Sequence, residues 1–111
     1  SWRAQFQTSM LNRILAGATA AMDPPLVHGK RLNLMYVTQV ATSPPRLAFF
    51  SNLDRDIPAH YPRFLETRFR RALDLVGTPL RLDFRRTGGD RAQTFRPRTR
   101  DTRPVRNRGR R

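Results

Sequence analysis

The chain has no cysteine and only two histidines in 111 residues. The lack of cysteine excludes disulfides and thiolate metal sites, and His28 and His60 lie too far apart in sequence to predict a ligand cluster. No apolar run approaches the roughly 20 residues that a membrane-spanning helix needs. The first five residues include neither an initiator Met nor the apolar stretch of a signal peptide. We therefore expect a soluble, cytoplasmic piece of a longer polypeptide, with no membrane partner.

Acidic residues and lysine are also scarce. Eight Asp and Glu stand against 22 Lys and Arg, of which all but Lys30 are arginine, and the formal net charge is +14. Such a charge attracts polyphosphates through electrostatic steering and counterion release, so nucleic acid is the leading partner class. The planar guanidinium of arginine suits phosphate and stacks on bases. A compositional bias of the genome explains Arg over Lys equally well, but not the excess of positive charge.

The charge density changes after Arg86, where the apolar periodicity stops. Residues 1–86 carry 13 Lys and Arg against 6 Asp and Glu, while residues 87–111 carry 9 against 2, so each part has a net charge of +7. The second part holds only two clearly apolar side chains, Phe95 and Val105, which bury too little surface to offset chain entropy. We predict a folded domain over 1–86 and a disordered, Arg-rich tail over 87–111.

Two helices are predicted from apolar stripes at a period of 3.6. The first is capped by Thr8 or Ser9 and ends before the prolines at 24 and 25; the second starts near Ala59 and ends with Gly77 just beyond its last turn. The stripes are Leu11, Ile14, Leu15, Ala18 and Met22 in the first helix, and Tyr61, Phe64, Leu65, Phe69, Ala72, Leu73 and Val76 in the second.

Three strands are predicted from alternation at a period of two. Their inward residues are expected to be Leu32, Leu34, Tyr36, Thr38 and Val40, then Leu47 and Phe49, then Leu80, Leu82 and Phe84. The intervening residues face outward. The element order is α-β-β-α-β, and the simplest α+β architecture is a two-layer domain with both helices on one face of a three-stranded sheet.

No catalytic or metal site is predicted. Gly29 and Lys30 invite comparison with a phosphate-binding loop, which requires a further glycine where Pro24 stands and Ser or Thr where Arg31 stands. A glycine turn entering a strand is the better interpretation. Asp54 and Asp56 lie in a loop without a third ligand nearby, which favours solvation and compensation of a helix N-terminus over metal binding.

Two surfaces are predicted to bind partners. The RNA-binding set is Lys30, Arg31, Arg81, Arg85 and Arg86, followed by Arg91, Arg96, Arg98, Arg100, Arg103 and Arg106 in the tail. An ordinary solvated face is an equal alternative for the folded part, whereas nine arginines in 25 residues favour RNA for the tail.

The second surface is the open face of the sheet, where Met35, Val37, Ala48 and Phe50 form an apolar patch that we expect to be covered by a partner. A preceding domain of the same polypeptide is the simplest cover, with RNA stacked on Phe50 as the alternative.

Three segments carry a resemblance to a known family: LNRIL at 11–15, PPLVHGKRLNLMYVTQVATSPP at 24–45 and HYPRFLETRFRRALDLVGTPLRLDFR at 60–85. Over about three quarters of its length, the chain resembles the C-terminal KH-like domain of the Der (EngA) family of tandem ribosome-assembly GTPases. The resemblance implies two preceding GTPase domains and a role in maturation of the large ribosomal subunit. It also implies GTP and Mg²⁺ in the parent, no cofactor in this chain, and contacts with ribosomal RNA and the GTPase domains.

One departure limits the analogy with RNA-gripping KH domains, which clamp the nucleic-acid backbone with a G-x-x-G loop. The chain contains no G-x-x-G, and the corresponding loop reads Asn-Leu-Asp-Arg-Asp at 52–56. We therefore expect contacts with folded RNA through shape and charge. The alternative function is a protein-interaction or regulatory domain whose basic tail is a nonspecific nucleic-acid anchor.

Overall fold

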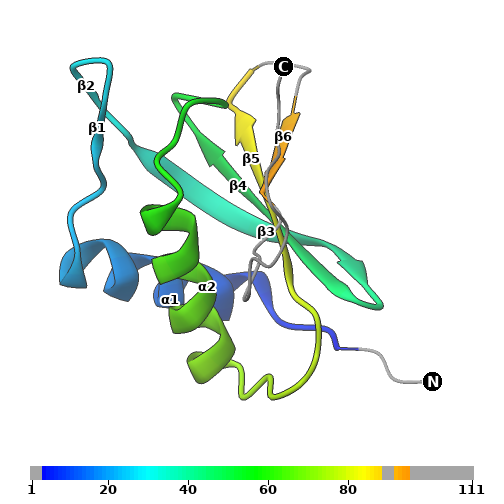
Figure 1. The fold of residues 1–111 in the computed structure, drawn as a ribbon. Coiled ribbons are helices and arrows are strands. Elements are labelled where there is room, and N and C mark those ends of the chain that lie inside the picture. Colours follow the sequence, from blue (N-terminus) through cyan, green and yellow to red (C-terminus); the bar gives the residue numbers. More distant parts are fainter. Residues whose placement is uncertain (1–3, 89–91, 96–111) are drawn as a thin grey trace, which may run out of the picture.

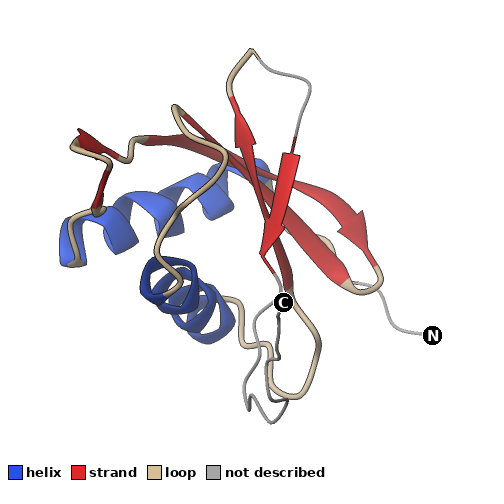
Figure 2. Cartoon of the chain, turned by 45° about the horizontal axis from the view of Figure 1, so that its top comes forward, coloured by secondary structure: helices blue, strands red, loops and turns tan. Residues whose placement is uncertain are grey.

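The computed structural model describes residues 4–88 and 92–95. The elements in chain order are α1 (Thr8–Ala21), β1 (Leu26–Val27), β2 (Lys30–Arg31), β3 (Leu34–Thr42), β4 (Pro45–Ser51), α2 (His60–Ala72), β5 (Arg81–Arg86) and β6 (Ala92–Phe95) (Figure 1). Strands β3 to β6 form one sheet in that order, parallel between β4 and β5 and otherwise antiparallel. Both helices lie on one side of this sheet (Figure 2), which confirms the predicted two-layer α+β fold.

The core lies between the sheet and the helices, and its centre is aromatic. Phe49 of β4 packs edge-on against Phe69 of α2, with ring centroids 5.4 Å apart, and stacks on Phe84 of β5 at 5.3 Å. Leu11 and Leu15 of α1 belong to the same buried cluster. The inward positions predicted for β4 and β5 are therefore confirmed, and one core joins both helices to the central strands.

The start of α1 and the end of α2 differ from the prediction. Helix α1 is preceded by Gln7, and neither Thr8 nor Ser9 caps it. Helix α2 stops early because Asp74 takes a left-handed conformation with φ 57°. The amide of Leu75 then donates to the Arg70 carbonyl at 2.9 Å, a hydrogen bond typical of a Schellman ending. Asp74 thus occupies the position predicted for Gly77, and Val76, predicted to be buried, is 86% exposed.

Strand β3 contains a bulge that reverses its predicted faces. Leu34 pairs with Ser51 and Tyr36 pairs with Phe50, so Met35 is an extra residue on β3. An extra residue shifts the alternation by one position. Beyond the bulge, Val37 is fully buried and Tyr36 is 43% exposed. The prediction that Tyr36, Thr38 and Val40 face the core is therefore wrong.

The free edge of β3 is covered by the chain itself. The side chain of Asn12 donates from Nδ2 to the Val37 carbonyl at 2.8 Å, and its Oδ1 accepts from the Val37 backbone amide at 2.9 Å. Further along, the Gln39 side chain accepts from the Phe6 amide at 2.8 Å and donates to the Ala4 carbonyl at 2.6 Å. The Asn12 contacts satisfy the Val37 backbone groups, which an edge strand otherwise offers to other chains. The Gln39 contacts hold the segment before α1 beside the strand, where the Ala4 amide donates to the Thr42 carbonyl at 3.3 Å.

The opposite edge is formed by β6, where Phe95 pairs with Leu82 and Ala92 with Arg85. The sequence predicted no regular structure after Arg86, so β6 adds a fourth strand to the expected three-stranded sheet. The short strands β1 and β2, which were not predicted separately, pair with each other in a second, two-stranded antiparallel sheet. Residues 96–111, the larger part of the predicted tail, lie outside the described residues.

Candidate nucleic-acid interface

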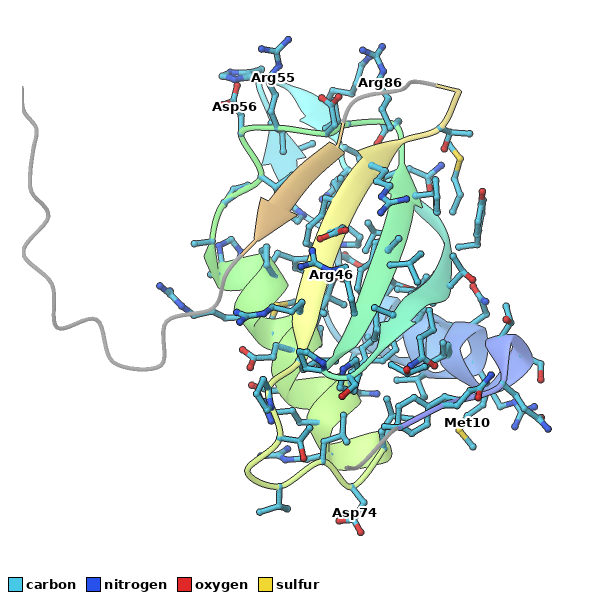
Figure 3. The ribbon with its side chains drawn as sticks, turned by 90° about the vertical axis from the view of Figure 1, so that its right-hand side faces the viewer. Met10, Arg46, Arg55, Asp56, Asp74 and Arg86 are labelled. Atoms are coloured by element: carbon cyan, nitrogen blue, oxygen red, sulfur yellow. The ribbon has the colours of Figure 1, made fainter. Side chains whose placement is uncertain are left out.

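Basic side chains from three segments gather at one end of the sheet, which we call the hairpin end: Lys30, Arg31, Arg55 and Arg86, all exposed. Asn52 joins two of these segments, because its side chain donates to the Arg31 carbonyl at 3.0 Å. The neighbouring Ser51 pairs with Arg86 at the end of β5. Figure 3 shows Arg55 and Arg86 together at this end, with Asp74 at the opposite end of the molecule. Three of the predicted RNA-binding residues are therefore brought together.

Sequence reasoning missed Arg55 because it stands between Asp54 and Asp56 in a polar loop. In the structure, the Asp56 carboxylate contacts His28 Nε2 at 3.0 Å, which ties this loop to the turn between β1 and β2. The hairpin end has four cations, and the carboxylates of Asp54 and Asp56 add two negative charges. With His28 counted as neutral, its formal charge is +2. The field at this end is therefore positive despite the acidic loop.

The remaining predicted cations of the folded part lie elsewhere. Arg81 starts β5, five residues from Arg86, which corresponds to about 16 Å along a strand. Arg85 donates from Nη2 to Asp83 at 3.2 Å, and Arg46 donates from Nη1 to the same carboxylate at 2.7 Å. Asp83 is only 3% exposed. Arg85 is therefore engaged in an ion pair, whereas none of the four cations of the hairpin end forms one within the described residues. Arg31 donates from Nη1 to the Pro24 carbonyl at 2.7 Å.

The face of the sheet away from the helices carries a row of side chains at one register level. Tyr36 on β3 stacks on Phe50 on β4, with centroids 4.7 Å apart and ring planes at 13°. The Arg85 guanidinium on β5 lies 5.9 Å from the Phe50 centroid. We call this the Tyr36–Phe50–Arg85 row. Cross-strand aromatic pairs of this kind contribute about 0.5–1.5 kcal/mol beyond their burial.

The apolar patch predicted for the same face is smaller than expected. Met35 is 47% exposed and Phe50 is partly exposed. Val37 and Ala48 have no exposed surface. The outward orientation predicted for Val37 is wrong because of the bulge, while Ala48 faces outward by register opposite Asp83 but offers nothing to a partner. Two of the four predicted docking residues therefore remain accessible.

A family model described as "KH-domain-like of EngA bacterial GTPase enzymes, C-terminal" matches residues 5–85. The chain belongs to this family. GTPase Der of Desulforudis audaxviator is 51% identical to the chain over 85 residues, which cover 77% of the chain and 19% of that relative. GTPase Der of Cellvibrio japonicus is 41% identical over 83 residues, covering 75% and 18%. The chain spans about a fifth of the length of these curated relatives.

The turn at Gly29 and Lys30 of this KH-like domain does not have the form of a phosphate-binding loop. Gly29 follows His28 in the turn between β1 and β2, with φ values of 80° and 52°, which is typical of a hairpin turn. The turn leads into a strand, so it offers no helix N-terminus to a phosphate. Among residues 4–88 and 92–95, no cluster of three potential metal ligands is found. Within the same ranges no helix is long and apolar enough to cross a membrane.

Six residues of the predicted RNA-binding set belong to the tail and lie outside the described residues: Arg91, Arg96, Arg98, Arg100, Arg103 and Arg106. The folded part thus offers two features to a nucleic acid, the hairpin end and the Tyr36–Phe50–Arg85 row.

Proposed function

We propose that this KH-like domain contacts ribosomal RNA during assembly of the large ribosomal subunit. In this proposal it is the C-terminal part of a cytoplasmic Der-type GTPase, whose other domains bind GTP and Mg²⁺. Membership of the EngA family and the relatives named GTPase Der support that setting. The domain itself contributes binding, not chemistry.

The hairpin end is the observation that carries the proposal. Lys30, Arg55 and Arg86 are exposed, and none of them forms an ion pair within the described part of the chain. Exposed cations gathered from separate segments suit a phosphate backbone, whose neutralisation releases counterions. In the absence of a G-x-x-G loop, such contacts recognise the shape and charge of RNA rather than its sequence.

Co-sedimentation with large ribosomal subunits over a salt series tests this function. Lys30→Gln with Arg86→Gln removes two cations of the hairpin end. We expect weaker binding and a salt slope reduced by about 2, since each phosphate contact contributes about 1. Arg13→Gln with Arg71→Gln removes the same charge from exposed positions on α1 and α2, and we expect a smaller effect. Equal losses in both variants would mean that net charge alone drives binding.

The second candidate function is docking onto the GTPase domains of the parent protein, with the tail as a nonspecific anchor. The exposure of Met35 on the outer face favours it. In that case Met35→Asp and Phe50→Asp weaken binding to separately produced GTPase domains. Met35→Asp is the cleaner variant, because Phe50 also supports the sheet. Unchanged binding by Met35→Asp would remove this candidate.

A further inference from the structure

We propose that the Tyr36–Phe50–Arg85 row binds one unpaired RNA base, stacked on the free face of the Tyr36 ring. The inference rests on the proposed RNA-binding function and names the chemical group that this part of the surface recognises. Its ligand is a planar base presented by a single-stranded or bulged nucleotide, with no requirement for a particular sequence.

Within the row, Phe50 has a partner on each side, whereas Tyr36 has a ring partner on one side only. Phe50 has Tyr36 stacked on it and the Arg85 guanidinium close to its ring. Tyr36 stands on β3, the outermost strand on this side of the sheet. It makes no second ring contact within the described residues, and it is 43% exposed. The side of the tyrosine ring away from Phe50 is therefore without an aromatic partner among the described residues, on a side chain that solvent reaches.

A base fits this position better than an apolar protein surface does. The two rings are nearly parallel, so a third planar ring extends an existing stack, and stacking of bases on aromatic side chains is tolerant of sequence. A stable protein interface needs about 800 Å² from each partner. Val37 and Ala48 are buried, so the large apolar side chains that β3 exposes are Met35, Tyr36 and Val40, each less than half exposed.

Charge around the row also favours a nucleic acid. Asp83, an acidic residue next to the row, forms ion pairs with both Arg46 and Arg85. These three residues have a net charge of +1 and lie beside the rings. Arg31 of the hairpin end is five residues from Tyr36, which limits their Cα separation to about 18 Å. A strand of a few nucleotides spans that distance, so one base stacks on Tyr36 while neighbouring phosphates contact the hairpin end.

The test measures binding of the 111-residue chain to two RNA hexamers with the same number of phosphates. One is wholly abasic, and the other is abasic except for a single adenine. We expect the adenine-bearing hexamer to bind roughly tenfold more tightly, the effect of one stacked base. Tyr36→Leu removes this difference, whereas Tyr36→Phe keeps it. Val40→Ala, at another exposed apolar position of β3, is the matched control and leaves the difference unchanged.

The outcomes separate this inference from the function on which it rests. Equal binding of the two hexamers by the wild-type chain would overturn the inference, as would a preference for adenine that survives Tyr36→Leu. The RNA-binding function would stand in either case if Lys30→Gln with Arg86→Gln still lowered the salt slope. Failure of every RNA to bind at low salt would remove both. Loss of GTPase-domain binding in Tyr36→Leu, with the base preference intact, would assign the row to protein docking instead.

Discussion

At the scale of single residues, Tyr61 is the clearest case of a side chain whose environment sets its chemistry. Its ring is fully buried, and its hydroxyl donates to the Met22 carbonyl at 2.9 Å, which ties α2 to the end of α1. Burial, followed by the negative charge of Asp23, raises the pKa of Tyr61 to about 12. The neutral form is therefore the one that the fold accepts.

This raised pKa predicts a loss of stability at high pH. An unfolded tyrosine ionises near pH 10, while the folded one keeps its proton up to about pH 12. Between these values the unfolded state binds fewer protons, so the free energy of unfolding falls as pH rises. In Tyr61→Phe this part of the fall is absent, although the lost hydrogen bond costs about 1 kcal/mol at neutral pH. Urea denaturation at pH 8 and pH 11 measures both effects, and an equal fall in the variant would contradict the assignment.

Other outcomes at the residue scale show where sequence reasoning reached its limit. Lys30, Arg31 and Arg86 were predicted one by one as RNA-binding residues, but their gathering at one end depends on how β2, β4 and β5 end together. Arg55 was not predicted to bind RNA, because it lies between two aspartates in a loop whose sequence indicated solvation and little net charge. The positions of Leu47, Phe49 and Phe84 were predictable, because simple alternation continues through β4 and β5.

At the scale of elements, the existence and order of the helices and the three main strands were predictable from periodicity. The bulge in β3 was not, because apolar residues occur on both alternating sets, such as Leu34 and Val37, and only pairing with β4 decides between them. The strand β6 is four residues long in an Arg-rich segment, too short to show a period. The end of α2 also differed from the prediction. The left-handed residue that follows the helix is Asp74, not the predicted Gly77, since aspartate tolerates this conformation.

The end of α2 supports a prediction about stability. Arg70 donates from Nε to Glu66 at 2.8 Å and from Nη1 to the Thr78 carbonyl at 2.7 Å. Arg70→Met removes these hydrogen bonds and leaves the buried Glu66 without its ion pair, so we expect a loss of about 2 kcal/mol. Chemical denaturation of Arg71→Gln, an exposed neighbour, is the control and should change by less than about 0.5 kcal/mol. A similar small change for Arg70→Met would show that these bonds contribute little.

At the scale of the whole molecule, positive charge is the property that both the folded domain and the tail share. The net charge of +14 was evident from composition, and the structure adds that the folded part concentrates exposed cations at the hairpin end while Arg46 and Arg85 are engaged with Asp83. The proposed RNA binding therefore has two electrostatic sources to draw on, the hairpin end and the arginines of residues 96–111.

The most direct measurement of the central claim is co-sedimentation with large ribosomal subunits in a chain whose tail charge is reduced by substituting Gln for Arg96, Arg98, Arg100, Arg103 and Arg106. We expect this variant to bind more weakly at moderate salt, with a flatter salt dependence, yet to retain binding at low salt through the hairpin end. Adding Lys30→Gln and Arg86→Gln should then remove most of what remains. Residual binding that is indifferent to these two substitutions, or the absence of any binding by the unmodified chain at low salt, would contradict the account.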